Sequence, residues 1–237
     1  RQRQMCIRDR NRVDDYMAFA STIPGGANFD VNERDSLTYV AAERVYMRGN
    51  IAEAKASFVR YLQSFPQGAF SVNSHYYLGL IDYNEKNYTG AASHLDKVVA
   101  YPDNKFSGEA MAICADMAYK GKEYEKALGL YKRMADRAVS QEERVQARTG
   151  AMRSAWMIKD YQEIVAMASG LIAESKLTPE LKNEAYYYRA KALLAEGQSK
   201  EAMSDLSFLS KDTRNVYGAE AKYLLAQLYF NAGQTDK

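Results

Sequence analysis

Proline, cysteine and long apolar runs are all scarce in this chain of 237 residues. Four prolines leave long stretches free of helix breakers, and no apolar run approaches the roughly eighteen residues that a membrane-spanning helix needs. Of the two cysteines, Cys6 lies in an atypical first segment, which leaves Cys114 alone. The sequence therefore excludes an internal disulfide, a CxxC metal pair and insertion of this chain into a membrane.

The first ten residues, RQRQMCIRDR, are rich in arginine, lack an initiator methionine and follow no helical or strand pattern. We interpret residues 1–10 as a non-native segment, similar to the translated adapter scar of some sequence fragments, and exclude them from the fold. They carry a net charge of +3, so the formal +2 of the whole chain becomes −1 for the remainder. A basic partner-binding surface is therefore not predicted.

Hydrophobic and aromatic residues are abundant: the chain is 47% hydrophobic and 26% charged and contains 19 tyrosines. This composition is too apolar for a disordered chain and is long enough to form a core. Its many Ala, Leu, Lys and Glu residues favour helices. The predicted fold class is therefore all-α.

A ten-residue frame with a small residue in its sixth place recurs along the chain. Its five copies start at residues 49, 86, 122, 159 and 197 and include KNYTGAASHL and KEYEKALGLY. The sixth places are 37, 36, 37 and 38 residues apart, a period that indicates a repeat protein. We expect the small side chain to allow a close helix crossing. The predicted packing residues are Ala54, Ala91, Ala127, Ile164 and Ala202.

A second helical stretch precedes each frame, so each unit is predicted to be a pair of antiparallel helices joined by a short turn. Pro66 and Pro102 follow the second helix of their units, and Pro179 lies where the fifth unit starts. The predicted fold is a right-handed α-solenoid of stacked helix pairs over residues 34–237. Its units span about residues 34–69, 70–105, 106–142, 143–178, 179–214 and 215–237, the last of which is incomplete.

The two ends of the array carry separate expectations. Residues 11–33 are predicted to hold the tail of a preceding helix and a loop, because STIPGGANFDVNERDS at 21–36 is rich in turn formers. Since the sixth unit contains its first helix alone, we interpret the chain as an internal fragment of a longer solenoid. Without a partner helix, local fraying is expected around Leu224, Leu225 and Tyr229.

These units resemble the tetratricopeptide repeat family, whose unit of about 34 residues carries a Leu-Gly, a turn with Tyr, an Ala, an aromatic residue and a Pro. The fourth unit departs from the family pattern because Ile164 and Ala168 invert the large and small places, and Ser199 of the fifth lacks the ring. Sel1-type and HEAT repeats remain alternatives. The resemblance is clearest in the second unit, at Leu78, Gly79, Tyr83, Tyr88, Ala91, Leu95 and Pro102.

Sequence motifs of catalysis are missing: there is no HExxH, GxSxG, GxGxxG or Walker-type loop. The two histidines lie on different predicted helices, His75 at a surface or helix cap and His94 near Asp96. We expect neither to have a catalytic or metal-binding role. The chain is predicted not to be an enzyme and to need no cofactor or metal.

In tetratricopeptide arrays the first helices line a concave groove that holds peptides or partner helices, and the resemblance implies such a groove here. Aromatic residues recur at two places of the first helices, and Tyr and Trp supply contact area at a low cost in side-chain entropy. Packing against neighbouring helices is the alternative role for the same rings. The predicted groove residues are Tyr39, Tyr46, Tyr76, Tyr83, Tyr119, Trp156, Tyr187, Tyr223 and Phe230.

The residues between these rings share no single charge. That mixture argues against the carboxylate clamp of co-chaperones and against single-stranded nucleic acid, which needs a cationic track between the rings. The expected partners are other proteins or peptide segments, and the oligomeric state is left open. The residues concerned are Glu43, Leu80, Asp116, Arg153, Lys191 and Gln227.

The joint YLQSFPQGAFSVNSHYYLG at residues 61–79 resembles the envelope-associated tetratricopeptide proteins of Gram-negative bacteria. That group includes the Tol-Pal-linked cell division coordinator and the lipoprotein of the outer-membrane assembly machine. The resemblance implies a non-catalytic scaffold in the periplasm or at the outer membrane, with a cytoplasmic location as the alternative. Two other functions remain open: a regulatory or substrate-recruiting array of a larger enzyme, and self-assembly through the end units.

Overall fold

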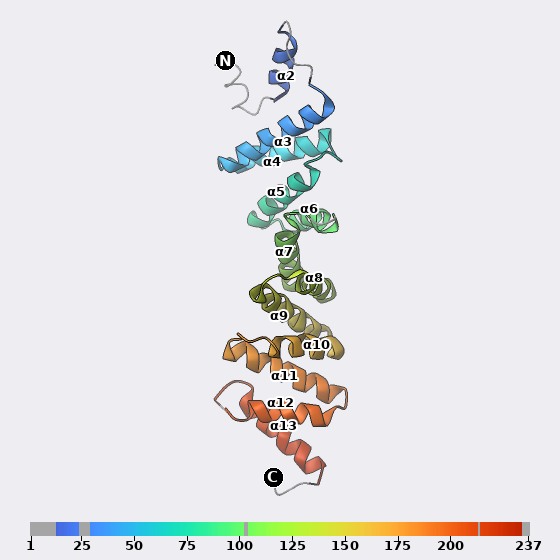
Figure 1. The fold of residues 1–237 in the computed structure, drawn as a ribbon, viewed down its shortest axis with the longest axis vertical. Coiled ribbons are helices and arrows are strands. Elements are labelled where there is room, and N and C mark those ends of the chain that lie inside the picture. The colour runs from blue at the N-terminus through green and yellow to red at the C-terminus, as the bar shows by residue number, and fades with distance from the viewer. Residues whose placement is uncertain (1–12, 24–28, 102–103, 213, 234–237) are drawn as a thin grey trace. The chain divides into compact units, whose positions relative to one another are not determined.

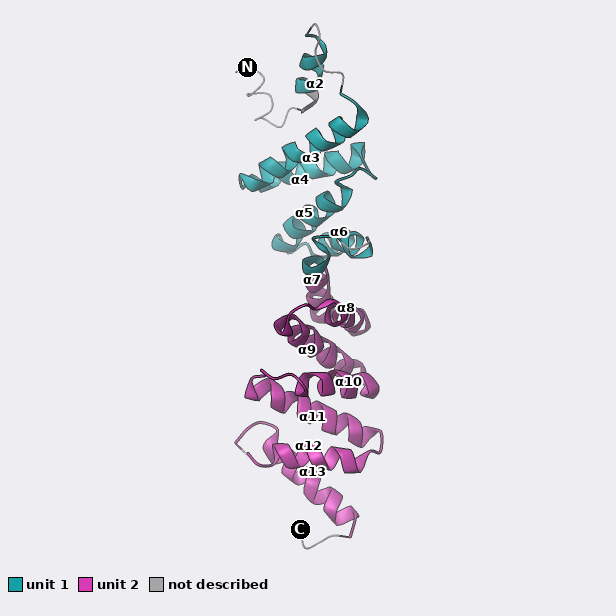
Figure 2. Ribbon diagram, in the orientation of Figure 1, with its two compact units in different colours: residues 1–110 teal, residues 111–237 magenta. Residues whose placement is uncertain are grey.

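The computed structural model describes residues 13–23, 29–101, 104–212 and 214–233, and these ranges form helices without any strand (Figure 1). The segment 1–10, which was interpreted as non-native, and Pro102 lie outside the described residues. The helices divide into two compact units, residues 1–110 and 111–237 (Figure 2). The prediction of an all-α repeat fold is confirmed.

The first unit contains the short helix α2 and two helix pairs, and the second unit contains the later pairs. Helix α7, Ser107–Lys120, includes the division between the units. The helices of the first unit are α2 (Val13–Ser21), α3 (Val31–Met47), α4 (Ile51–Ser64), α5 (Ser71–Asn84) and α6 (Tyr88–Ala100). Those that follow α7 are α8 (Tyr124–Arg137), α9 (Gln141–Ile158), α10 (Tyr161–Ile172), α11 (Pro179–Ala195), α12 (Ser199–Leu209) and α13 (Gly218–Asn231).

One residue in the left-handed conformation closes the turn within each helix pair, and we call it the turn residue. After α5, the amide of Lys86 donates to the carbonyl of Tyr83 (3.0 Å) and that of Asn87 to Asp82 (2.8 Å), which is the Schellman pattern. Successive turn residues lie 36 to 38 positions apart, so the sequence period is the spacing of this turn. With φ between 60° and 79°, they are Gly49, Lys86, Lys122, Lys159, Gly197 and, after α13, Gly233.

The second helix of each pair starts two residues after the turn residue, so the sixth place of the ten-residue frame lies one turn inside it. All five residues predicted for that place, Ala54, Ala91, Ala127, Ile164 and Ala202, are fully buried.

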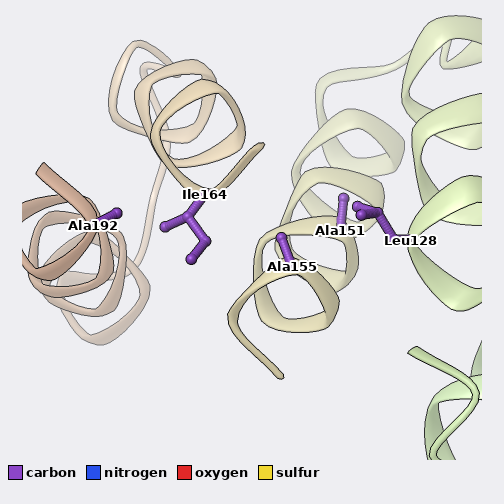
Figure 3. Packing of buried hydrophobic residues seen from close by; sticks show 5 residues of the cluster. All are labelled: Leu128, Ala151, Ala155, Ile164 and Ala192. Atoms are coloured by element: carbon purple, nitrogen blue, oxygen red, sulfur yellow. The ribbon is translucent and has the colours of Figure 1, made fainter. Parts of the chain in front are cut away.

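The large residue in the sixth place of the fourth unit has an explanation in its neighbours. Ile164 on α10 is fully buried in a cluster with Ala151 and Ala155 of α9, Ala192 of α11 and Leu128 of α8 (Figure 3). Three of these four neighbours are alanines, which leave room for a larger side chain. The inversion therefore keeps the volume of the crossing roughly constant.

The loop expected at 21–36 begins where α2 ends, at Ser21, but its second end is wrong, because α3 already begins at Val31. The Asp30 carboxylate accepts from the amide of Glu33 (2.8 Å), and the Glu33 carboxylate accepts from the amide of Asp30 (3.0 Å). This is a capping box, which satisfies two amides at the start of a helix. Polar residues that resemble a loop are here the first turn of α3.

Leu224, Leu225 and Tyr229, for which fraying was expected, contact the preceding helix pair, and their fraying stays a prediction. Leu225 is buried in a cluster with side chains of α11 and α12, and the other two pack partly buried against it. The rings of α13 that remain exposed are Tyr223 and Phe230, at 62% and 72%. The apolar stripe of α13 thus faces the preceding helix pair.

A first prediction concerns the turn residues. Lys122 holds a left-handed conformation that costs a residue with a Cβ about 1–2 kcal/mol, and glycine avoids this cost. We expect Lys122→Gly to raise the free energy of unfolding by up to about 1 kcal/mol, because the greater freedom of glycine in the unfolded chain offsets part of the gain. Gly197→Lys should lower it by a similar amount. Urea unfolding measures both; destabilisation by Lys122→Gly would contradict the assignment.

A second prediction tests the close crossing of α5 and α6. A Cβ built at Gly79 would lie 2.5 Å from Cγ of Leu95, so Gly79→Ala forces that leucine to move. We expect a loss of about 1–3 kcal/mol in the free energy of unfolding. Gly129 in α8 is the matched control, since nothing lies within 4 Å of its added Cβ. Gly129→Ala should stabilise by about 0.5–1 kcal/mol, and equal effects at both sites would refute the crossing.

Candidate functional site

Three positions of every first helix lie on one stripe, because they stand ten, six and three residues before the turn residue. We call these positions the first, second and third rows, and together the first-helix face. The first row is Tyr39, Tyr76, Ala112, Thr149, Tyr187 and Tyr223. The second row is Glu43, Leu80, Asp116, Arg153, Lys191 and Gln227. The third row is Tyr46, Tyr83, Tyr119, Trp156, Leu194 and Phe230.

In the first unit, both first-row rings pack between helix pairs. Tyr39 is 3% exposed and its ring stacks on Phe70 at 4.4 Å between centroids. Tyr76 is 6% exposed and stacks on Phe106 at 4.1 Å. Because both rings are buried, they pack between helices and are not accessible to a partner in a groove.

The hydroxyl groups of these rings are hydrogen-bonded donors. Tyr76 Oη donates to the carboxylate of Glu109 (2.5 Å), and Tyr39 Oη donates to that of Glu43 (2.6 Å). Burial, followed by the neighbouring carboxylate, raises the pKa of both phenols above the usual range. Both stay protonated near neutral pH. Tyr76 thereby links α5 to Glu109 on α7. Glu43, in contrast, lies on the same helix as Tyr39, and the link from Tyr39 to α5 is the bond that its hydroxyl accepts from Nδ2 of Asn73 (3.2 Å).

The second unit repeats this arrangement at Tyr187. Its ring stacks on Tyr217 (4.6 Å), and its hydroxyl donates to Glu220 (2.8 Å) on α13. We call this set a tyrosine joint: a first-row tyrosine, an aromatic residue 30 or 31 positions later, and a hydrogen-bond partner on the next first helix. Tyr39 with Phe70, Tyr76 with Phe106 and Tyr187 with Tyr217 form three such joints.

Sequence reasoning missed the second ring of each joint. The signal was present, because Phe70, Phe106 and Tyr217 all stand sixteen residues before their turn residue. These rings lie at the start of the next first helix, outside both the ten-residue frame and the three rows. A search limited to those patterns could not pair them with the first-row tyrosines.

The third-row rings keep part of their surface exposed while they pack locally. Tyr83 and Tyr119 contact Tyr88 and Tyr124 edge-on, at 5.9 and 5.4 Å between centroids. The ring of Trp156 stacks on that of Tyr188 on α11, at 4.5 Å between centroids. These half-buried rings, with Tyr46, Tyr187, Tyr223 and Phe230, are the predicted groove residues that retain accessible area, and contact with a partner stays a prediction for them.

The charged residues of the second row are neutralised within the protein. Arg153 donates through Nε and Nη2 to both carboxylate oxygens of Glu184, each at 2.7 Å. Lys191 Nζ lies 3.1 Å from the carboxylate of Glu220. No second-row residue is buried. The face therefore presents accessible polar groups without a dominant charge.

An open pocket of about 800 Å³ lies along α9 in the second unit. One wall is the ring of Tyr131 on α8, which covers Gly150 so closely that an added Cβ would lie 2.5 Å from it. Lys176 and Leu181 also line the pocket. The sequence analysis did not predict this pocket. Its lining residues are Tyr131, Gln141, Glu142, Val145, Gln146, Thr149, Gly150, Arg153, Lys176 and Leu181.

The two histidines form a pair, which corrects their separate placement at a surface and beside Asp96. His75 on α5 and His94 on α6 are half-buried, with their Nδ1 atoms 2.9 Å apart. Burial, then Lys97 and the second histidine, lowers the pKa of His75 to about 4. Burial also lowers the pKa of His94, although Asp82 at 4.0 Å opposes this shift.

Other kinds of site were sought in the part of the chain that the structure describes. Within it, no group of three or more His, Cys, Asp or Glu side chains is arranged to hold a metal ion. None of its helices combines the length and the apolar character needed to cross a membrane.

The comparisons with known proteins agree with this geometry. Residues 39–105, which cover most of α3 to α6, match the tetratricopeptide repeat family. The structure is similar to YrrB, described as a TPR protein with an unusual peptide-binding site, with a TM-score of 0.53 at 14% sequence identity. That similarity covers 79% of this chain and 91% of YrrB. The fold is therefore a helical repeat of the tetratricopeptide type.

Two further structures are similar at lower TM-scores. MamA from Desulfovibrio magneticus gives 0.46 at 16% identity, over 76% of this chain and 94% of MamA. A tetratricopeptide repeat protein from Parabacteroides merdae gives 0.46 at 14% identity, over 99% and 87% of the two chains. No curated protein matches the chain by sequence.

A third prediction follows from the histidine pair. Because the folded-state pKa of His75 is below its ordinary value of 6.5, unfolding takes up protons between those two values. The free energy of unfolding is therefore unaffected by this group above about pH 6.5. It decreases as the pH falls from there towards 4, because the unfolded chain binds a proton that the folded chain does not. We expect the urea midpoint to fall between about pH 7 and pH 5, and His75→Asn to flatten that change. An equal slope in the variant would show that groups other than His75 cause it.

Proposed function

We propose that this chain is a non-catalytic scaffold that binds a segment of another protein on its first-helix face. The observation that carries the proposal is the combination, in the second unit, of accessible rings and an open pocket on that one face. Trp156 of the third row keeps exposed area, while Thr149 and Arg153 of the other rows line the pocket. Aromatic side chains beside a concave site supply most of the binding energy in many protein interfaces.

Apolar contacts and hydrogen bonds, rather than charge of one sign, would select the partner segment. The second-row ions are already paired within the chain, as Arg153 is with Glu184 and Lys191 with Glu220. A terminal carboxylate or a nucleic-acid backbone would need unpaired cations in a row. A protein segment with apolar and polar side chains fits this face better than either.

Two independent findings support interaction with protein as the general role. Residues 39–105 match a repeat family whose folds generally mediate protein–protein contacts. The similar structure YrrB is described as having a peptide-binding site. On this basis we extend peptide binding to the present chain as a proposal.

We also propose a location in the cell envelope, which rests on the resemblance of the joint at residues 61–79 to envelope-associated proteins. Fractionation of cells that express the full open reading frame tests this location. Recovery from the periplasm or with the outer membrane supports it, and recovery from the cytoplasm alone overturns it.

A fourth prediction tests the face itself. Leu80→Glu places a charge on the second row of the first unit, and Trp156→Ala removes a ring from the third row of the second unit, so that each variant tests the face of its own unit. With the chain immobilised, we expect each variant to lower recovery of partner proteins about tenfold or more, the size of a hot-spot loss. Mass spectrometry of the recovered proteins measures the effect.

The matched control for this experiment is Val59→Glu, which adds the same charge to an exposed valine of the second helix α4. It should leave partner recovery unchanged. Circular dichroism melts of all three variants separate lost binding from lost folding. Unchanged recovery with folded Leu80→Glu and Trp156→Ala would mean that the face does not bind partners.

A further inference from the structure

The pocket along α9 occupies the place where a tyrosine joint is missing. At the corresponding positions between α9 and α11, the first-row residue is Thr149 and the residue sixteen before the turn is Leu181. Both are smaller than the pair Tyr187 and Tyr217 of the next joint, and both line the pocket. The space that two stacked rings fill elsewhere is thus open here.

The polar groups around this space match those of the complete joint. In the complete joint, Glu220 accepts from the Tyr187 hydroxyl (2.8 Å) and from Lys191 (3.1 Å), whose Nζ lies 5.9 Å from the centre of that ring. At the pocket, Glu184 stands in the place of Glu220 and Arg153 in that of Lys191. A ring in the pocket would therefore lie near Arg153, as the ring of Tyr187 lies near Lys191 in the complete joint.

Thr149 does not replace the missing tyrosine. Its hydroxyl donates to the carbonyl of Val145 in its own helix (2.7 Å), so it is directed back along α9. Arg153 uses Nε and Nη2 for Glu184, and a guanidinium has five N–H donors. Unused donors of Arg153 and the amide of Gln146 are then available in the pocket for one more polar group.

We propose that this pocket binds a tyrosine side chain of the partner segment, in the place that the protein's own tyrosine takes at the other joints. The ring packs against Leu181 and Tyr131, the guanidinium of Arg153 lies over its face or edge, and its hydroxyl hydrogen-bonds to the polar lining. This inference rests on the proposed function, because the segment that carries the tyrosine is the partner on the first-helix face.

Charge favours an uncharged ring over an anion as the occupant. Glu142 lines the pocket together with Lys176, and Arg153 is already neutralised by Glu184. A phosphate or carboxylate would face that acidic side chain without an unpaired bidentate partner. The volume of about 800 Å³ lies within the range of small-ligand sites, so the pocket has room for the ring together with adjoining parts of the partner segment.

The test uses N-acetyl-L-tyrosine amide as the probe and follows the backbone amides by NMR. We expect shifts at Thr149, Gly150 and Leu181 with a dissociation constant on the order of 1 mM, as befits a single side chain. N-acetyl-L-leucine amide should bind at least fivefold more weakly. Equal binding of both probes, or shifts that avoid these three amides, would overturn the proposal.

The decisive variant is Thr149→Tyr, which supplies the missing ring from the chain itself. It should weaken binding of the probe tenfold or more and leave the melting temperature equal or higher, as it restores the joint. Val216→Tyr is the control, because it adds the same ring at an exposed position outside the pocket lining, and it should bind the probe like the natural chain. Should Thr149→Tyr fail to fold, Leu181→Phe fills the same space and must weaken binding likewise; full binding by either folded variant refutes the site.

The same variants separate this inference from the proposed function. If partner recovery survives in Thr149→Tyr but is lost in Leu80→Glu, the face binds its partner without a tyrosine in this pocket. If the probe binds the natural chain while neither face variant affects partner recovery, the pocket exists but the scaffold function fails. The proposal requires that Thr149→Tyr lower both probe binding and partner recovery.

Discussion

The left-handed turn residue between paired helices is the constraint on which the rest of the structure depends. It closes a Schellman motif, so the second helix starts two residues later and the first helix ends at a fixed place. Each residue added between the rows and this turn would rotate the earlier part of the helix by about 100°. Constant spacing from this point is why Ala91 and Ala127 are buried while Leu80 and Asp116 stay accessible.

The sequence was sufficient for features that depend on local spacing and insufficient for those that depend on contacts between distant residues. The period and the five sixth-place residues could be predicted because each depends on the spacing between one turn and the helix that follows it, and this spacing recurs in every unit. The start of α3 at Val31 was missed because the acidic pair Asp30 and Glu33 has the composition of a loop. The partner of Leu225 was missed because two faces of α13 are apolar, and only the tertiary packing decides which is buried.

The candidate site divides in the same way. The repeat spacing and the family resemblance placed nine rings on one face, but they did not show which of the rings the next helix pair would enclose. Tyr39 and Tyr76 are covered because Phe70 and Phe106, which lie about thirty residues later in the chain, stack on their rings. The pocket is less predictable still, since it results from two smaller residues, Thr149 and Leu181, at places where three other pairs of units have rings.

The joint between α9 and α11 differs from the tyrosine joints in the kind of force that holds it. A fork of two hydrogen bonds from Arg153 to Glu184 is largely electrostatic, and the arginine side chain is 47% exposed. Dissolved ions screen such a pair, whereas the stacking of Tyr187 on Tyr217 responds little to them. The neighbouring joint also contains an ion pair, Lys191 with Glu220, but it keeps its ring stack when that pair is screened, so the joint between α9 and α11 depends on electrostatic attraction for a larger share of its contacts.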